Sequence, residues 1–167
     1  DRAILSEMAD LGWMGILLPE AMGGADFGFR AAGLIAEEMG RNLTAAPFLS
    51  TAILAATILR KAGGPVAEQW GPRIAAGDAV IALALDEGAK HRPDRIATKA
   101  DLDGDGYVLN GRKVFVVDAF GADRLIVVAL VNGAPALFWV DPAQGGVSVS
   151  AQVLLDFPQL WKRVKKV

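Results

Sequence analysis

The spacing of apolar residues along this chain changes near residue 78. Before that point, apolar residues recur every three or four positions, which is the period of a helix that buries one face. After it, β-branched and apolar runs alternate with glycine-containing turns, which is typical of strands. The sequence therefore predicts an α+β protein with a helical N-terminal domain at residues 1–77, a β-domain at residues 78–155 and an atypical tail at residues 156–167.

Four helices are predicted before residue 78, each with an apolar face. The first ends at Gly12 and the second at Gly40, because glycine commonly follows the last turn of a helix. The third starts near Pro47, where a missing N–H costs nothing, and the fourth covers residues 65–77. The apolar residues that define the four faces are Ile4, Leu5, Met8, Leu11, Leu34, Ile35, Met39, Ile53, Leu54, Ile58, Leu59, Val66, Trp70 and Ile74.

About six short strands are expected after residue 78. Residues 103–106 carry turn chemistry, Asn110-Gly111 is a two-residue hairpin signal, and further turns are expected at residues 132–133 and 145–146. Short strands joined by tight turns favour a small antiparallel barrel or sandwich. The clearest strands are residues 79–85, 114–117, 125–131, 136–140 and 147–155.

The composition is that of a globular protein, because the chain is 53% hydrophobic and 22% charged. A formal net charge of −2 gives no electrostatic case for nucleic-acid binding. Residues 42–59 are uncharged but rich in alanine, which favours a buried helix over a membrane span. No secretory signal is present, so we expect a cytoplasmic protein, and the start at Asp1 is consistent with a chain that begins partway into a longer protein.

Residue types and spacing alone reveal no catalytic or metal site. The chain has no cysteine and one histidine, His91, which excludes disulfides and the usual zinc sites. Nothing around His91 forms the nucleophile elbow that a Ser-His-Asp triad would need. Asp101, Asp103 and Asp105 begin like a calcium loop, but the following residues do not continue it. From residue types and spacing alone, the sequence indicates two domains and does not identify an activity.

The order of several motifs is more informative than any one of them. Residues 11–24, LGWMGILLPEAMGG, join a helix end to a buried stretch and a Pro-Glu-x-x-Gly-Gly loop, and EEMGR follows at residues 37–41. WGPRIAAGDAVIALAL at residues 70–85 and DGDGYVLNGRK at residues 103–113 come later in the chain. This order resembles the acyl-CoA dehydrogenases, flavoenzymes in which a helical N-terminal domain precedes a β-domain and a C-terminal helical domain follows.

The resemblance implies that FAD contacts two segments of the β-domain. One usually reads T-E-P-x-A-G-S-D and is aligned with residues 85–92, and the other usually reads W-I-T-N and is aligned with residues 115–118. Leu85 and Val117 stand in place of the two threonines, and each lost hydrogen bond costs about 0.5–1.5 kcal/mol. Flavin binding is therefore expected to be weakened rather than excluded. The positions assigned to the cofactor are Leu83, Ala84, Leu85, Phe115, Val116 and Val117.

The resemblance also implies a substrate-binding position and a missing base. His91 aligns with a family serine near the thioester, although an exposed histidine in a polar loop is the alternative reading. The family's base is a glutamate of the C-terminal domain, and nothing after residue 150 resembles that domain. No catalytic residue is therefore assigned, and Glu37 and Glu38 are interpreted as surface charges.

Three functions stay open. The first is an acyl-CoA dehydrogenase-like flavoprotein, which would oxidise the α,β bond of an acyl-CoA with hydride transfer to FAD and would be inactive as this chain alone. The second is a degenerate, non-catalytic partner subunit of a dehydrogenase complex. The third is an acyl-CoA- or lipid-binding module without redox chemistry. The partners implied are an acyl-CoA, further subunits in a homo- or hetero-oligomer, and electron-transfer flavoprotein.

Overall fold

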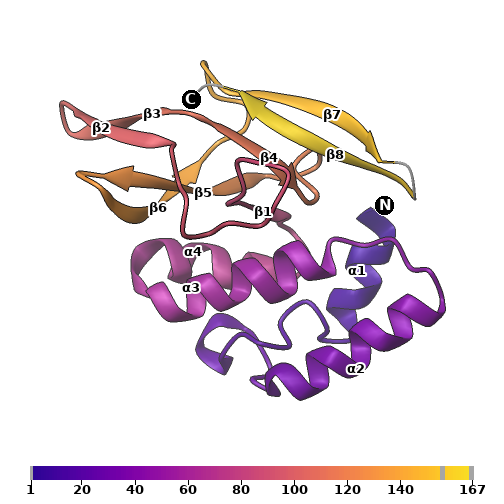
Figure 1. The fold of residues 1–167 in the computed structure, drawn as a ribbon. Coiled ribbons are helices and arrows are strands. Elements are labelled where there is room, and N and C mark those ends of the chain that lie inside the picture. The colour runs from indigo at the N-terminus through magenta and orange to yellow at the C-terminus, as the bar shows by residue number, and fades with distance from the viewer. Residues whose placement is uncertain (1, 155–156, 166–167) are drawn as a thin grey trace. The chain divides into compact units, whose positions relative to one another are not determined.

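The computed structural model describes residues 2–154 and 157–165 (Figure 1). The chain divides into two compact units, Asp1–Val80 and Ile81–Val167. The first unit is helical and the second is built from strands, so the predicted α+β class is confirmed.

The helical unit follows the predicted order of helices. The helix predicted to start near Pro47 is continuous but begins as a π-helix, η2, which passes directly into α3. This run covers most of the uncharged stretch, and no helix of the described residues is long and apolar enough to cross a membrane. The bounds are α1 Arg2–Asp10, the short 3₁₀ helix η1 Glu20–Met22, α2 Gly28–Arg41, η2 Phe48–Ala55, α3 Ala56–Ala62 and α4 Gly64–Ala75.

Gly12 ends the first helix as predicted. It adopts a left-handed φ of 75°, its N–H donates to the Ala9 carbonyl at 2.8 Å, and the Trp13 N–H donates to the Met8 carbonyl at 2.8 Å. This paired arrangement is the Schellman motif, which satisfies carbonyls that the last helical turn leaves open. Leu11 lies in the turn beyond the helix and is 65% exposed, so its expected place on the buried face is wrong.

The other helical faces are confirmed only in part. Trp70 and Ile74 of α4 are buried, but Val66, in the first turn of that helix, is 38% exposed. On α2 the buried residue is Ala32, while Leu34 is 61% exposed. The helix also continues through Gly40 to Arg41, because glycine can hold helical dihedral angles when no turn is required.

The core of the helical unit includes the non-helical stretch at residues 14–18. Two backbone bonds of 3.0 Å, from Asp26 N to the Leu18 carbonyl and from Phe27 N to the Ile16 carbonyl, bring the chain back along this stretch after the Pro-Glu-x-x-Gly-Gly loop. Gly24 lies so close to the Leu18 backbone that a Cβ there would overlap its carbonyl. The loop glycine is therefore required by close packing.

The β unit contains two open sheets rather than one closed barrel. In the larger sheet the order is β1-β5-β2-β3, with β6 paired to β5, and the smaller sheet has the order β4-β8-β7. The pairs β1–β5 and β2–β5 are parallel and the remaining pairs are antiparallel, so the predicted antiparallel arrangement holds only in part. The strands are β1 Ile81–Ala84, β2 Lys99–Asp103, β3 Gly106–Asn110, β4 Arg112–Val116, β5 Arg124–Val131, β6 Ala134–Val140, β7 Ser148–Leu154 and β8 Phe157–Lys165.

The backbone of β8 was not predicted from the sequence. It falls in the segment treated as a tail, and it pairs antiparallel with both β4 and β7. Its pairing with β4 shifts register between Lys113 and Val116, which is one place where β4 departs from regular strand geometry.

The Asn110-Gly111 hairpin prediction is wrong. Tight hairpin turns lie instead at Gly104–Asp105, between β2 and β3, and at Asn132-Gly133, between β5 and β6, where Asn132 and Gly133 have φ values of 50° and 84°. Gly111 instead joins β3 in one sheet to β4 in the other. A Cβ at this position would collide with the Thr98 side chain, so the glycine serves a close approach rather than a turn.

We expect Gly24→Ala to destabilise the chain by about 1–3 kcal/mol, because the new methyl group has no room beside Leu18. Gly33→Ala is the matched control, since it adds a methyl in α2 with nothing within 4 Å, and it should stabilise the chain by about 0.5–1 kcal/mol. Urea denaturation measures both changes. Equal stabilities for the two variants would contradict the tight packing of the loop.

Candidate functional site

The two segments assigned to the cofactor lie next to each other in the β unit. One follows β1 and the other is the end of β4 and its continuation. The Val114 N–H donates to the Asp86 carbonyl at 2.7 Å and joins them directly. Ala84 and Val116 are buried, so their side chains pack within the unit. The side chains that remain partly exposed in these segments are those of Leu83, Leu85, Phe115 and Val117.

Phe115 has an unusual backbone conformation for a bulky residue. Its φ of 53° lies in the left-handed region, as does that of Asp118 at 59°. Such a conformation costs of order 1–3 kcal/mol and persists only where the surrounding structure enforces it. Nothing in the sequence pattern indicates this conformation.

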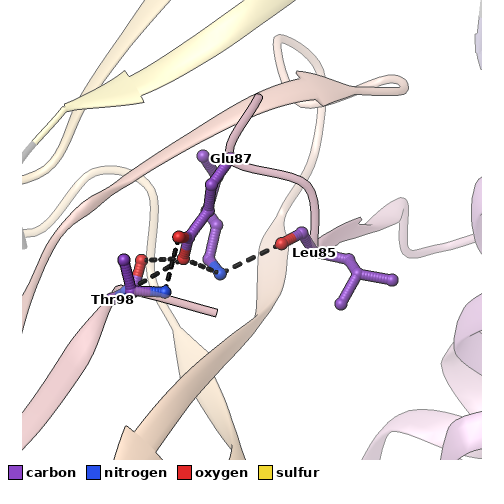
Figure 2. A network of polar contacts seen from close by, with 5 residues as sticks. Leu85, Glu87 and Thr98 are labelled. Atoms are coloured by element: carbon purple, nitrogen blue, oxygen red, sulfur yellow. Dashed lines mark hydrogen bonds and ion pairs between the residues drawn. The ribbon is translucent and has the colours of Figure 1, made fainter. Parts of the chain in front are cut away.

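A buried ion pair holds these two segments together (Figure 2). The Lys113 side chain, with the residue 1% exposed, donates from Nζ to Glu87 Oε1 at 2.7 Å and to the Leu85 carbonyl at 3.0 Å. Lys113 therefore connects β4 to the segment after β1 at two points. Neither residue was assigned a role from the sequence.

The Glu87 carboxylate receives further hydrogen bonds from the strand entrance at residues 97–98. The Ala97 N–H donates to Oε2 at 2.6 Å, and Thr98 donates to Oε1 from its N–H at 2.9 Å and from its hydroxyl at 2.5 Å. Thr98 is itself the residue against which Gly111 packs. The carboxylate thus ties together three stretches of chain that are distant in sequence.

The electrostatics of the pair favour the ionised form of Glu87. Burial raises the pKa of the Glu87 carboxyl, but the hydrogen bonds from Lys113, Thr98 and Ala97 outweigh burial and lower that pKa to about 2. Burial is the largest effect on Lys113 and lowers the pKa of its ammonium below the usual value, although the hydrogen bond to Glu87 and the charges of Glu87 and Asp86 act in the opposite direction.

One sequence signal could have identified Glu87. The T-E-P-x-A-G-S-D pattern contains a glutamate at its second position, and starting the alignment at Asp86 instead of Leu85 places that glutamate on Glu87. Asp86 then stands at the threonine position. Leu85 then lies just before the segment, and its backbone, rather than a missing hydroxyl, is the feature that matters.

His91 lies outside the buried network. Its side chain is 67% exposed, and Nδ1 is 3.0 Å and 3.1 Å from the two carboxylate oxygens of Asp86. The neighbouring Arg92 is paired with Asp94 at 2.7 Å. The Asp86 contact orients the imidazole on the loop after β1, close in sequence to the cofactor segment, and a substrate contact for His91 stays a prediction.

Comparison with known proteins identifies the family. The model of the acyl-CoA dehydrogenase N-terminal domain matches residues 1–78. Acyl-CoA dehydrogenase FadE27 of Mycobacterium tuberculosis is 32% identical over 152 residues, which are 90% of this chain and 40% of FadE27. The chain belongs to the acyl-CoA dehydrogenase family. It spans about two fifths of the length of this curated relative.

Solved structures share the fold. The ChsE4–ChsE5 complex from Mycobacterium tuberculosis matches with a TM-score of 0.85 at 30% identity, over 99% of this chain and 44% of that one. An acyl-CoA dehydrogenase complexed with FAD from Bacillus anthracis matches with a TM-score of 0.85 at 26% identity, over 99% of this chain and 30% of that one. Both of the described units therefore have counterparts in this family.

The two cofactor segments fit a flavin through apolar contacts with the face of its ring rather than through polar side-chain contacts. Leu83, Leu85, Phe115 and Val117 offer partly exposed apolar surface for a planar ring. Leu85 and Val117 carry no hydroxyl, so hydrogen bonds to the ring edge fall to backbone N–H groups. Among the described residues, the N–H groups of Leu85 and Val117 donate to no protein acceptor and are available to a ligand.

The ionised Glu87 carboxylate should stabilise the fold at neutral pH and lose that effect in acid. Its pKa falls from 4.5 in the unfolded chain to about 2, so the stabilisation is complete above the unfolded value and is lost as the pH drops toward about 2. The full effect is on the order of 3 kcal/mol. Glu87→Gln should lower Tm at neutral pH and flatten the acid limb, and the two Tm curves should converge near the lower pKa.

Thermal denaturation as a function of pH checks this expectation. Glu37→Gln, which removes an exposed carboxylate of α2, is the control and should keep the wild-type acid limb. Parallel acid limbs for wild type and Glu87→Gln would contradict an ionised Glu87 in the folded chain.

Proposed function

We propose that this chain is the N-terminal and middle part of a FAD-dependent acyl-CoA dehydrogenase. The enzyme would oxidise the α,β bond of an acyl-CoA thioester, with transfer of hydride to the flavin. The observation that carries this proposal is the direct joining of the segment after β1 to the end of β4, the two segments that face the flavin in the family. Family membership and the fold support the same reading.

In this proposal the chain binds and orients but does not supply the base. Phe115 and the neighbouring apolar side chains pack against the ring, and backbone N–H groups donate to its polar edge. FAD, when bound, supplies the hydride acceptor. The base that removes the α-proton comes from sequence outside these 167 residues, and the chain alone is expected to be inactive.

A non-catalytic partner subunit is the second candidate. The observation that favours it is the absence of both family threonines, whose positions are held here by Asp86 and Val117. The ChsE4–ChsE5 structure is a complex of two named chains, so members of this fold do assemble as unlike pairs. In that case this chain would complete an oligomer in which another subunit holds the flavin, and electron-transfer flavoprotein would meet the catalytic subunit.

Restoring the hydroxyls should strengthen flavin binding. Each of Asp86→Thr and Val117→Thr should tighten FAD binding about 2- to 10-fold, since one hydrogen bond is worth about 0.5–1.5 kcal/mol. Titration of FAD, followed by quenching of its fluorescence and by its visible absorption, measures the change. Leu102→Thr, on an exposed position of β2, is the matched control and should leave affinity unchanged.

The outcome separates the two candidates. FAD retained by the wild-type chain and tightened by both threonine variants supports the dehydrogenase. A wild-type chain and variants that all stay colourless after incubation with FAD contradict a flavin site in this chain and favour the partner subunit.

A further inference from the structure

Lys113 is the one charged residue that is buried among those whose exposure the structure describes. A buried ion pair is often no more stabilising than apolar residues of similar volume, so stability alone does not account for it. The feature that distinguishes this lysine is its second contact, the 3.0 Å bond from Nζ to the Leu85 carbonyl (Figure 2).

Two consecutive carbonyls of the segment after β1 are held by β4. The Leu85 carbonyl accepts from Lys113 Nζ, and the Asp86 carbonyl accepts from the Val114 N–H at 2.7 Å. In a trans peptide the C=O and the N–H point in opposite directions, and no peptide of the described chain is cis. The N–H groups of Asp86 and Glu87 are therefore directed away from the β4 atoms that hold the carbonyls.

These two N–H groups are unused within the protein. Among the described residues, neither Asp86 N nor Glu87 N donates to a protein acceptor. A backbone N–H without a protein acceptor can donate to an electron-rich atom of a ligand. One of the two carbonyl contacts is a backbone bond that any residue at position 114 except proline could make. The other depends on the side chain of Lys113.

We propose that Lys113 is a positioning residue for the flavin, which fixes the Leu85–Asp86 peptide so that its N–H can donate to an acceptor at the edge of the ring. Glu87 holds the ammonium in place, and Thr98 and Ala97 hold Glu87. The inference rests on the proposed function, because it takes FAD as the ligand. The buried pair of Lys113 and Glu87 thus has a role in flavin binding in addition to its role in packing.

The test compares the 167-residue chain with the variant K113M/E87Q. This pair of substitutions removes both charges together, so that no unpaired ion is left buried, and the glutamine retains an acceptor for Thr98. R41M/E37Q, which removes an exposed ion pair of α2 at 2.6 Å, is the matched control. K113Q/E87Q, with two neutral polar side chains, provides the same comparison if the first variant fails to fold.

Three readouts are taken on each protein. Hydrogen–deuterium exchange without FAD reports on the Val114 N–H, which donates to the Asp86 carbonyl, and should be at least about tenfold faster there in the double variant. FAD titration should show about tenfold weaker binding. At saturating FAD, the visible absorption band of the bound flavin should shift, because a donor to the ring is lost, and a purely structural change elsewhere would not move it. The control should match wild type in all three.

The outcomes distinguish failure of the inference from failure of the proposed function. A double variant with wild-type exchange, affinity and flavin spectrum overturns the role of Lys113 while leaving FAD binding intact. A wild-type chain that binds no FAD overturns the proposed function, and the positioning role toward flavin falls with it. Faster exchange together with weaker, spectrally altered FAD binding supports both.

Discussion

The ion pair between Lys113 and Glu87 is the contact on which the candidate site depends. A lysine ammonium taken out of water is costly unless its hydrogen bonds are replaced, and here a carboxylate and a carbonyl supply them. The carboxylate in turn receives backbone and hydroxyl donors from residues 97–98. Glu87 and Lys113 are 26 residues apart in the chain, and the strands next to them, β1 and β4, belong to different sheets. The ion pair therefore joins two segments that strand pairing does not join.

The rest of the site is arranged around that fixed point. The Lys113 side chain is directed inward, and two residues later the backbone turns to a positive φ at Phe115, where β4 leaves the regular ladder with β8. Gly111, just before the lysine, lets the chain pass close to Thr98. Backbone strain and close approach are tolerated here because the surrounding bonds leave the segment few alternatives.

This arrangement bears on how a family member can change its flavin contacts. Side-chain hydroxyls at positions 86 and 117 can be lost one substitution at a time, whereas backbone donors survive any side-chain change that preserves the peptide orientation. A site that relies on oriented N–H groups therefore retains part of its binding capacity after Asp86 and Val117 replace the family's threonines. Flavin binding at such a site then depends more strongly on the groups that orient the peptides.

The sequence by itself determined the α+β class, the order of the helices, the end of α1 at Gly12, the hairpin at Asn132-Gly133 and the family. Each of these follows from local patterns: apolar period, glycine at a helix end, or motif order. It did not determine that Asn110-Gly111 is a link between sheets, because the preference of that dipeptide for a turn is local and the contact with Thr98 is not.

Only the tertiary structure decided the mixed sheet, the pairing of β8 and the site itself. Parallel pairing of β5 with β1 and β2 depends on which strands meet across long loops, and periodicity carries no information about partners. Burial of Lys113 contradicts what a lysine beside Arg112 suggests in sequence, because a charge is buried only where distant groups satisfy it. Those groups, Glu87 and the Leu85 carbonyl, come together through the fold alone.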